Sequence, residues 1–438
     1  MSEWKKVKIG DVFNIEKGSL QSSKNEAGEY DFITAAAEWK THNSYDHDCE
    51  AIVYAVAASG SLGRAHYVNG KFIASDLCFI LTEKDKENYP INFMFYQIVF
   101  EMMRDEIVSK TKTGTSKESI NRGNFSNYEI PYFPIDFQLA NYQRFIDAKN
   151  KIKLLNEESD KQKLYIKQLR QNILQDAIEG KLTEEWRKNN PVVKGNPDFD
   201  AEALFEKIQE EKRHTDSKKK EKSLPEITED EKPFEIPEGW KWVRLGAIIK
   251  EPPRNGYSPK AVDFETPVKT LKLGAVTYGV FNPAEYKYID EDIPQKSYCW
   301  LKNGDILIER SNSIEYVGIC AIYTGNDNEF MYPDLLMRFR VFDILSNKFV
   351  HKAMISPFNR TYFMNNAKGS QKTMPKINQE CVVNTIIPLP PLAEQKEIVR
   401  VVELQLAKVD QLEKQIAERE TMTKQLMQSI LKDAFREV

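Results

Sequence analysis

The amino-acid sequence predicts a mixed α/β (α+β) fold built from two similar units, each followed by a long helix. Two observations carry this prediction. First, the segment of eleven residues that begins at Lys167 returns at Lys424, with eight positions identical. Second, four residues upstream return at the same spacing: Ile130, Pro131, Pro134 and Gln138 return as Ile387, Pro388, Pro391 and Gln395. A repeat this long predicts two copies of one fold.

The repeat divides the chain into five expected segments. The first unit spans residues 1–135, and its long helix spans 136–180. A connector that contains a charged helix spans 181–236. The second unit spans 237–392, and its long helix spans 393–438. Gly180 is expected to end the first long helix, since glycine is common just past a helix C-terminus.

Within each unit, short apolar runs predict strands and a longer periodic run predicts a helix. The strands are expected at 51–56 and 79–81 in the first unit, and at 271–273, 305–308 and 335–339 in the second. The helices are expected at 91–110 and 349–364. A charged helix is expected in the connector from about 199 to 222, and its Lys218-Lys219-Lys220 run is interpreted as a solvated face because acids flank it.

The two long helices carry apolar residues at alternating spacings of three and four, which is typical of a coiled-coil seam. About 40 residues at roughly 1.5 Å each give a rod of about 60 Å. Leu164, Tyr165, Leu404 and Leu406 lie off this stripe and predict an additional helical partner. The alternative is that the two helices pack only on each other. The seam is expected at Ile152, Leu155, Leu169, Ile173, Val409, Leu412, Leu426 and Ile430.

Composition excludes several classes of protein. The 438 residues are 29% charged, but the net charge is only −4, so bulk charge indicates no polyanion partner. The five cysteines have no paired spacing and are expected to be reduced, as in a cytoplasmic protein. No apolar run has membrane length and no signal peptide is expected. The five histidines have no metal-ligand spacing, so no metal site is expected.

Motifs for catalysis are weak. The run Gly114-Thr115-Ser116-Lys117 lacks the frame of a phosphate-binding loop. The run from Asn282 to Tyr286 lacks the second proline of an adenine methyltransferase motif, and no glycine-rich cofactor loop accompanies it. We therefore expect no catalytic residues and no cofactor in this chain.

Local charge points to nucleic acid more clearly than net charge does. Residues 344–379 contain six basic residues and no acid, and the equivalent loop of the first unit is also basic. Basic loops rich in small polar residues can contact a phosphodiester backbone. The alternative is a solvated helix and turn. The predicted phosphate contacts are Lys112 and Lys117, beside Thr115 and Ser116, and Lys368 and Lys372, beside Ser370. Gln371 in the same loop is expected to assist base readout.

Two further loops carry side chains that can read base edges, because Arg and Asn each form paired hydrogen bonds with bases. Arg254, Asn255, Tyr257, Ser258 and Lys260 lie in a loop stiffened by proline and glycine. A second loop, just past a strand, contains Arg310, Asn312 and Ser313. Lys17 and Ser19 flank Gly18 at the corresponding place in the first unit. Each loop taken alone has a surface turn as its alternative.

Taken in order, these motifs resemble the specificity subunit of a type I restriction–modification system, over essentially the whole chain. The most specific motif is Ile387-Pro388-Leu389-Pro390-Pro391-Leu392-Ala393-Glu394-Gln395 entering the second long helix. It follows Trp-x-x-Val-x-Leu-Gly at 240–246, Arg254-Asn255-Gly256, Gly304-Asp305-Ile306-Leu307 and Gly369-Ser370-Gln371-Lys372. The first unit is more diverged, and its Gln138 lacks the preceding Glu.

The resemblance implies a function for each segment. The two units are expected to be target-recognition domains at opposite ends of an antiparallel coiled coil, each reading half of a split, asymmetric site in double-stranded DNA. The helices are expected to hold two modification subunits, which methylate adenine with S-adenosylmethionine, and through them restriction subunits that use ATP. These cofactors and Mg are expected on the partners, with the complex in the cytoplasm.

Three other functions stay open from the sequence. A coiled-coil scaffold with two protein-binding modules predicts no salt-dependent DNA binding. A silent specificity cassette predicts that partner subunits are absent. An enzyme with its active site between unit and helix requires an acid–base pair, which the sequence does not indicate.

Overall fold

The computed structural model describes residues 4–58, 60–114, 118–215, 224–369 and 374–434. The chain divides into two compact units, each with its own sheets and its own buried apolar clusters. Unit 1 comprises Met1–Asp160 with Ala417–Val438, and unit 2 comprises Lys161–Ile416. Within the described residues, no helix is both long enough and apolar enough to cross a membrane.

Unit 1 is built around a six-stranded sheet in the order β2-β7-β5-β6-β3-β4. Neighbouring strands are antiparallel except β3 and β6, which are parallel. The strands are β2 (Phe13–Lys17), β3 (Tyr30–Ile33), β4 (Lys40–His42), β5 (His47–Ala55), β6 (Ala65–Ala74) and β7 (Cys78–Glu83). Two small ladders pair β1 (Lys6–Lys8) with β10 (Glu129–Pro131), and β8 (Lys112–Thr113) with β9 (Ser119–Ile120).

Alternating side chains of the sheet in unit 1 enter two different apolar clusters. Ile52 and Tyr54 of β5 pack into the cluster formed with the helices, whereas Val53 and Ala55 pack into the cluster on the opposite face. This is the side-chain alternation expected of a strand that is buried on both faces. The helices are α1 (Ile9–Val12), α2 (Phe93–Met102), α3 (Arg104–Thr111) and α4 (Arg122–Asn127).

Unit 2 contains a four-stranded sheet, β12-β18-β16-β17, and a three-stranded sheet, β13-β15-β14. The pair β11 (Lys241–Arg244) and β19 (Ile386–Leu389) forms a separate ladder. The other strands are β12 (Ile249–Asn255), β13 (Ala261–Val262), β14 (Val268–Leu271), β15 (Tyr286–Ile289), β16 (Ile306–Glu309), β17 (Cys320–Ile322) and β18 (Leu336–Val341). The helices are α6 (Glu184–Asn189), α7 (Ala201–Thr215), α8 (Asn347–Met354), α9 (Pro357–Asn366) and α10 (Gln379–Asn384).

Both units contain the same antiparallel core, which confirms that the chain is built from two repeated domains of mixed α/β fold. The order β2-β7-β5-β6 in unit 1 corresponds to β12-β18-β16-β17 in unit 2. The terminal ladders also correspond, because Val7 pairs with Ile130 and Val243 pairs with Ile387. The additional strands differ: β3 and β4 extend the sheet of unit 1, whereas β13, β14 and β15 form a second sheet in unit 2.

The single helix predicted in each unit is two helices in the structure. In unit 1 the break is at Met103, whose backbone leaves the helical region at φ −85° and ψ 5°. In unit 2 Ser356 caps a new helix, with Pro357 in its first turn. Proline is favoured there because its missing N–H has no partner in a first turn. The strand predicted at 271–273 ends earlier, at Leu271, and a 3₁₀ turn follows.

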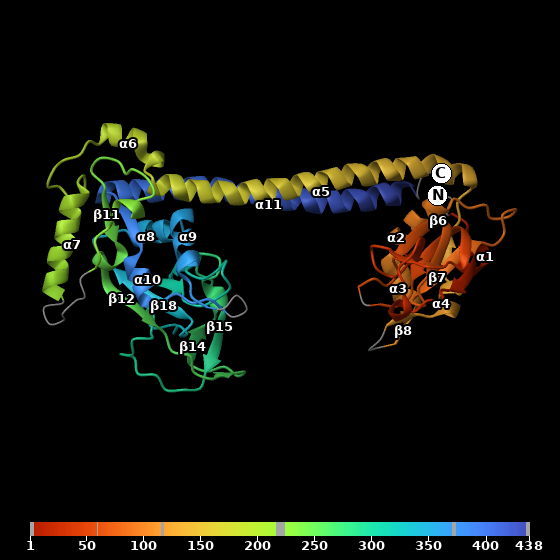
Figure 1. The fold of residues 1–438 in the computed structure, drawn as a ribbon, viewed down its shortest axis with the longest axis horizontal. Helices are drawn as coiled ribbons and strands as arrows, with labels where there is room; N and C mark the ends of the chain where they lie inside the picture. The colour runs from red at the N-terminus through yellow and green to blue at the C-terminus, as the bar shows by residue number, and fades with distance from the viewer. Residues whose placement is uncertain (1–3, 59, 115–117, 216–223, 370–373, 435–438) are drawn as a thin grey trace. The chain divides into compact units, whose positions relative to one another are not determined.

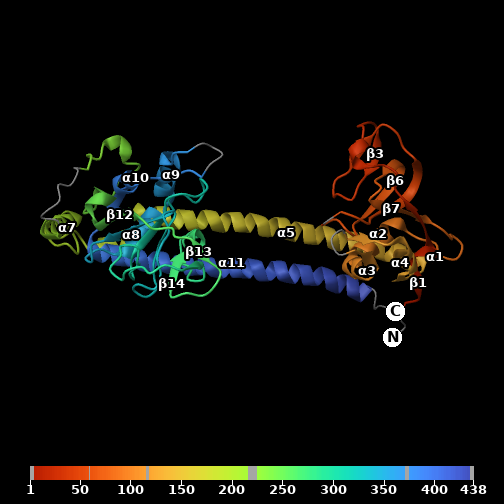
Figure 2. The ribbon, with the colours of Figure 1, turned by 90° about the horizontal axis from the view of Figure 1, so that it is seen from below.

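Two long helices, α5 (Ile135–Ile178) and α11 (Leu392–Ala434), follow the repeated cores (Figure 1, Figure 2). In unit 2 their segments run antiparallel, since Arg170 forms ion pairs with Asp410 and Glu413, while Arg187, just beyond α5, reaches Glu394 at the start of α11. Apolar residues of both helices share one buried cluster: Ile166, Ile173 and Ala177 with Val402, Val409 and Ile416. Gly180, past the end of α5, has a left-handed φ of 74°, as expected of a residue beyond a helix C-terminus.

Half of the predicted seam residues are not buried. Ile173 and Val409 are buried and Ile152 is partly buried. The prediction is wrong for four leucines that are 40–48% exposed: Leu155, Leu169, Leu412 and Leu426. Ile430 has a side chain outside the described part of the chain. Ser159 and Thr423 are buried on the same helices. Small polar residues therefore occupy buried positions on both long helices. Off the stripe, Leu164, Tyr165 and Leu404 are exposed and Leu406 is partly buried.

Candidate nucleic-acid interface

In unit 2, a turn before β18 brings two of the predicted loops to one edge of the sheet. The N–H of Tyr257 donates to the carbonyl of Tyr332 at 3.0 Å. The hydroxyl of Ser258 donates to the carboxylate of Asp334 at 2.5 Å. The N–H of Arg310 donates to the carbonyl of Leu335 at 2.9 Å. The turn from 332 to 335 therefore holds the loop at 254–260 beside the loop at 310–313.

A third predicted segment joins this edge. Lys368 and Lys376 exchange two backbone hydrogen bonds of 2.9 Å, which form the base of a hairpin. The N–H of Ile377, the next residue, donates to the carbonyl of Arg310 at 3.0 Å. We call these three segments, residues 254–260, 310–313 and 368–369 with 374–377, the edge of unit 2.

Gly256 allows the backbone of this edge to approach closely. Its N–H donates to the carbonyl of Leu336 at 3.2 Å. A Cβ atom at Gly256 would lie 2.0 Å from the carbonyl oxygen of Tyr332, which no real side chain tolerates. Glycine is therefore required for the contact that fixes the Arg254 loop.

Unit 1 repeats this backbone frame. The N–H of Gly18 donates to the carbonyl of Cys78 at 3.0 Å, and the N–H of Ser19 donates to the carbonyl of Ala74 at 3.1 Å. A Cβ atom at Gly18 would lie 2.1 Å from the carbonyl oxygen of Ser75. Lys17 and Ser19 therefore occupy the places of Asn255 and Tyr257. Lys17 is exposed, but the hydroxyl of Ser19 donates to Asp46 at 2.6 Å.

The second and third segments of the edge also have counterparts in unit 1. The N–H of Val56 donates to the carbonyl of Leu77 at 2.9 Å, and the N–H of Ile120 donates to the carbonyl of Val56 at 2.8 Å. These bonds match those of Arg310 and Ile377. The counterpart of Arg310 is therefore the apolar Val56. We call residues 16–20, 56–58 and 112–114 with 118–120 the edge of unit 1.

The side chains of the Arg254 loop differ in their contacts and in their exposure to solvent. The guanidinium carbon of Arg254 lies 3.4 Å from the centroid of the Tyr298 ring. The side-chain oxygen of Asn255 is buried without a hydrogen-bond partner among the described residues. Tyr257 donates to Glu291 at 3.0 Å, and this hydrogen bond raises the pKa of the tyrosine. Lys260 is exposed.

The amide of Asn312, which was predicted to read bases, makes internal hydrogen bonds. Its side-chain nitrogen donates to Glu309 at 2.7 Å, and its side-chain oxygen accepts the N–H of Ser313 at 2.7 Å. Glu309 also accepts a hydrogen bond of 2.6 Å from Thr277. Burial raises the pKa of Glu309. Asn312 therefore shapes the loop, while Ser313 is exposed.

The predicted phosphate contacts have unequal environments. Lys112 forms an ion pair of 2.7 Å with Glu118 across the β8–β9 hairpin. Lys368 is exposed. The other predicted residues of the two hairpins lie outside the described residues: Thr115, Ser116, Lys117, Ser370, Gln371 and Lys372.

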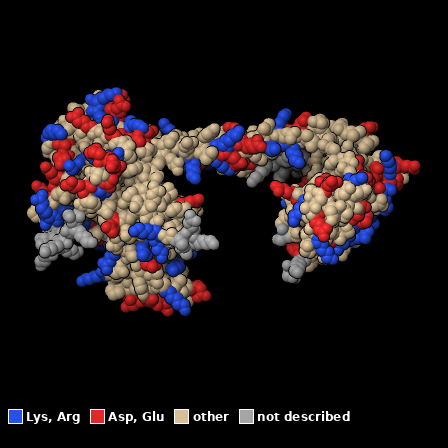
Figure 3. All heavy atoms as spheres, in the orientation of Figure 1, with Lys and Arg blue, Asp and Glu red and all other residues tan. Residues whose placement is uncertain are grey.

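The structure adds Lys376 to the candidate residues. Arg310, Lys368 and Lys376 line one pocket of about 340 Å³, together with Glu380 and the amides of Asn366, Asn378 and Asn384. Figure 3 shows Lys and Arg side chains gathered on the face of unit 2 where Figure 1 labels β15 and β18. The signal in the sequence was the acid-free stretch 344–379, which includes Lys376.

Other basic residues of that stretch do not belong to the edge. Arg360 donates to the carbonyls of Val317 and Glu315 at 2.6 and 2.9 Å. Lys348 forms an ion pair of 2.9 Å with Glu403 of α11. The charges of these two residues therefore do not contribute to the edge of unit 2, because tertiary contacts direct them elsewhere.

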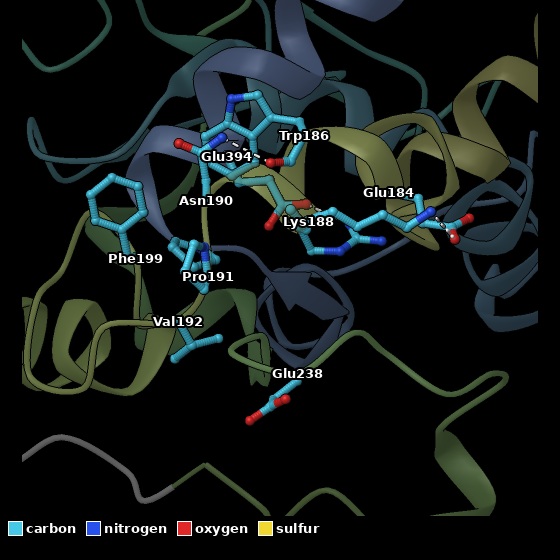
Figure 4. Close-up of a pocket in the computed structure, with 11 residues that line it drawn as sticks. Glu184, Trp186, Lys188, Asn190, Pro191, Val192, Phe199, Glu238 and Glu394 are labelled. Atoms are coloured by element: carbon cyan, nitrogen blue, oxygen red, sulfur yellow. Dashed lines mark hydrogen bonds and ion pairs between the residues drawn. The ribbon is translucent and has the colours of Figure 1, made fainter.

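A second pocket in unit 2, of about 500 Å³, lies in the connector (Figure 4). It is lined by Trp186 and Phe199, whose rings are stacked at 6.4 Å, and by the buried Glu394. Glu394 accepts hydrogen bonds from Thr183, Arg187 and Trp240. None of the predicted site residues lines this pocket. Across the described part of the chain, no group of His, Cys, Asp and Glu side chains is arranged to hold a metal ion.

Curated relatives carry a consistent description. The specificity subunit of the type I restriction enzyme EcoDI of Escherichia coli is 26% identical over 448 residues, an alignment that covers 99% of this chain and 88% of that protein. The EcoEI specificity subunit of Escherichia coli is 29% identical over 257 residues, which cover 57% of this chain and 41% of the relative. The chain thus spans less than half the length of the EcoEI subunit in that match.

Solved structures show the same fold. A chain from a type I restriction–modification system, solved to explain complex assembly and conformational transition, has a TM-score of 0.61 at 18% identity, with 99% of this chain and 97% of that chain covered. The HsdS subunit of Thermoanaerobacter tengcongensis has a TM-score of 0.51 at 17% identity, with 99% and 96% covered.

The family match covers both repeated units. Residues 1–163 and 237–419 match the family model described as the type I restriction modification DNA specificity domain. These two segments contain the edge of unit 1 and the edge of unit 2. The protein therefore belongs to the type I restriction–modification DNA specificity domain family.

Proposed function

We propose that this chain is the non-catalytic DNA-specificity subunit of a type I restriction–modification complex and reads a split double-stranded DNA site with unlike halves. The observation that carries the proposal is one backbone frame, present in both units, that presents different side chains. Glu16, Lys17 and Ser19 stand where Arg254, Asn255 and Tyr257 stand. Two similar backbone frames that present different side chains are suited to recognising two different short DNA sequences around a fixed gap.

The two kinds of DNA contact divide among the edge residues. Lys368 and Lys376 line one pocket with Arg310 and are suited to phosphate oxygens, which position a protein on the duplex without reading sequence. Arg254, Asn255 and Arg310 are suited to base edges. Lys17 is our candidate for the corresponding contact in unit 1.

The long helices supply spacing and assembly in this proposal. We propose that α5 and α11 pair along their length as an antiparallel coiled coil of about 60 Å. Their exposed apolar residues, among them Leu164, Tyr165 and Leu404, would carry two modification subunits and, through them, the restriction subunits. S-adenosylmethionine, ATP and Mg would be bound by those partners, and the complex would act in the cytoplasm.

The proposal is tested by making the complex methylate a genome. The chain is co-expressed with a modification subunit from the same operon in a host that lacks adenine methylation, and N6-methyladenine is mapped by single-molecule sequencing. We expect one gapped motif with unlike halves. A stable complex that leaves every adenine unmethylated would contradict the proposal and favour a protein-binding scaffold or a silent cassette. The modification subunit expressed alone is the control.

A further inference from the structure

Tyr298 is an aromatic residue of unit 2 that stacks on one of the candidate base-reading residues. We infer that Tyr298 is a positioning residue for Arg254, and that the stacked pair reads a guanine in one half of the site. This inference rests on the proposed function. It goes beyond that function by naming a base and the residue that orients its reader.

Arg254 differs from every other arginine in the described part of the chain. Its guanidinium is the only one there with neither a hydrogen bond nor an ion pair. Arg338, which faces Arg254 in the register of β12 and β18, is bound to Glu251 at 2.6 Å, and Arg340 is bound to Asp305 at 2.6 Å. The five N–H groups of Arg254 are therefore free to bind a ligand.

The orientation of Arg254 is nevertheless fixed. Its guanidinium carbon lies 3.4 Å from the centroid of the Tyr298 ring, a stacking distance. Its backbone carbonyl accepts the hydroxyl of Tyr332 at 3.3 Å. Tyr298 is 37% exposed, so the stack lies at the protein surface. Stacking occupies a face of the planar guanidinium and leaves the N–H edge available for paired hydrogen bonds.

Guanine is the ligand that best fits such an edge. In the major groove it presents two acceptors, O6 and N7, and paired hydrogen bonds from arginine to these atoms are the commonest specific contact to DNA. Phosphate also accepts paired hydrogen bonds from arginine. The comparison between the units favours a base over a phosphate. Every DNA sequence offers phosphates, so a phosphate contact would favour a basic residue in both units. The counterpart of Arg254 in unit 1 is instead the acidic Glu16. A side chain that changes sign between two similar readers is suited to selecting a base.

The test uses the intact complex of this chain with its modification subunit and the gapped motif obtained for the wild-type chain. Binding is measured on duplexes in which each base pair of the motif is changed in turn. Four variants are compared: Arg254→Ala, Tyr298→Ala, Tyr298→Phe and the control Tyr278→Ala, which removes a tyrosine of unit 2 that is 80% exposed. Thermal unfolding of each variant checks that the fold is kept.

We expect the wild-type complex to prefer G·C at one position by roughly 5- to 150-fold. Arg254→Ala should abolish this preference at that position and leave the other half-site unchanged. Tyr298→Ala should reduce the preference, whereas Tyr298→Phe, which keeps the stack, and Tyr278→Ala should preserve it. Restoration of the preference by phenylalanine distinguishes ring stacking from a general effect of the substitution.

Three results would overturn the inference. The first is a motif in which neither half contains a G·C pair that Arg254→Ala affects. The second is an equal loss of affinity for every duplex, which would assign Arg254 to a phosphate. The third is an unchanged preference in Tyr298→Ala. Each of these presupposes a wild-type complex that binds a specific motif; the absence of any specific motif for the wild-type chain would instead contradict the proposed function.

Discussion

Unit 1 and unit 2 share a backbone frame but present opposite chemistry from it. Gly18 and Gly256 make the same close approach to a carbonyl oxygen, which would lie 2.1 and 2.0 Å from a Cβ atom at these two positions. The residue two places earlier is Glu16 in one unit and Arg254 in the other. Backbone hydrogen bonds hold the frame, so its side chains can change without changing the fold. In the proposed function, this separation allows one architecture to read two different sequences.

The start of each long helix shows the same contrast between a constant and a variable residue. The buried Gln138 donates to the carbonyl of Phe133 at 2.7 Å and accepts the N–H of Asn92 at 2.7 Å. Gln395 donates to the carbonyl of Pro390 at 3.0 Å and accepts the N–H of Ser346 at 3.1 Å. Asn92 and Ser346 are the N-caps of α2 and α8. Each glutamine thus joins the long helix to the core of its unit.

The residue before each glutamine is where the units differ. Glu394 accepts the indole N–H of Trp240 at 2.7 Å. Its counterpart Phe137 packs instead on the ring of Trp4, with ring centroids 4.8 Å apart. The glutamate missing from the first copy of the motif is therefore replaced by an aromatic contact with the equivalent tryptophan.

The largest loss of stability is expected from removing Glu394, which forms the polar contact with Trp240. Glu394→Ala leaves the buried Trp240 N–H without its acceptor and Arg187 without its carboxylate partner, which should cost about 3 kcal/mol of unfolding free energy. Urea unfolding of the purified chain measures it. Glu184→Ala, which removes an exposed carboxylate 3.4 Å from Lys188, is the control and should cost about 0.5 kcal/mol or less. Equal effects of the two substitutions would refute the assigned role of Glu394.

The two glutamines should be equally important in the two units. Gln138→Leu and Gln395→Leu each leave a buried carbonyl and a partly buried N–H without the glutamine that bonds them, so each should cost roughly 1–3 kcal/mol of unfolding free energy. Urea unfolding again measures the loss, with the exposed Gln143→Leu as the control. A stability unchanged by one substitution and reduced by the other would mean that the repeated hydrogen bonds are not equivalent in energy.

Opposite responses to pH are expected from two histidines. Burial lowers the pKa of His351 in unit 2 to about 4, so this histidine takes up a proton near pH 6 only when the chain is unfolded. The free energy of unfolding should therefore fall by about 1 kcal/mol as the pH falls from 7.5 to 5.5. For His47 in unit 1, burial opposes protonation, but hydrogen bonds with Asp46 and Glu16 outweigh it and raise the pKa. The stabilisation from His47 should therefore be present below its unfolded pKa and be lost as the pH rises through the folded value.

Unfolding curves of His47→Gln and His351→Gln between pH 5 and 8 measure these contributions. The difference between His47→Gln and the wild-type chain should grow as the pH falls, whereas His351→Gln should remove part of the acid sensitivity. Parallel pH profiles for the wild-type chain and both variants would show that neither histidine is linked to folding.

The smallest effect concerns the phosphate contacts. Lys368→Ala should lower the slope of log affinity against log salt by about one unit, since one phosphate contact is lost. Lys112→Ala should lower it less, because Lys112 already pairs with Glu118 at 2.7 Å. Binding of the complex to its motif duplex at several salt concentrations measures both slopes. An equal decrease for the two variants would show that the ion pair between Lys112 and Glu118 breaks when the protein binds DNA.

Local patterns in the sequence were enough to predict the repeat, the long helices and the turn at Gly180. They also identified Arg254, Arg310 and Lys368 as candidate DNA-binding residues, in three separate loops. The rest depends on contacts that the three-dimensional fold creates. The pairing of Asn312 with Glu309 and of Lys112 with Glu118, and the stack of Arg254 on Tyr298, depend on how turns bring side chains together. The exposed leucines of the long helices were mispredicted because apolar periodicity does not distinguish a buried seam from an uncovered flank.

The central claim is that each unit reads its own half of the DNA site, and site-specific photocrosslinking tests it most directly. A photoreactive amino acid is placed at Ser19 in one version of the complex and at Tyr257 in another, because these residues occupy equivalent places on the two edges. Each complex is irradiated on the motif duplex, and the crosslinked nucleotides are mapped. We predict that the probe at Ser19 reacts only with one half-site and the probe at Tyr257 only with the other. Crosslinks from both probes to the same half would contradict the account.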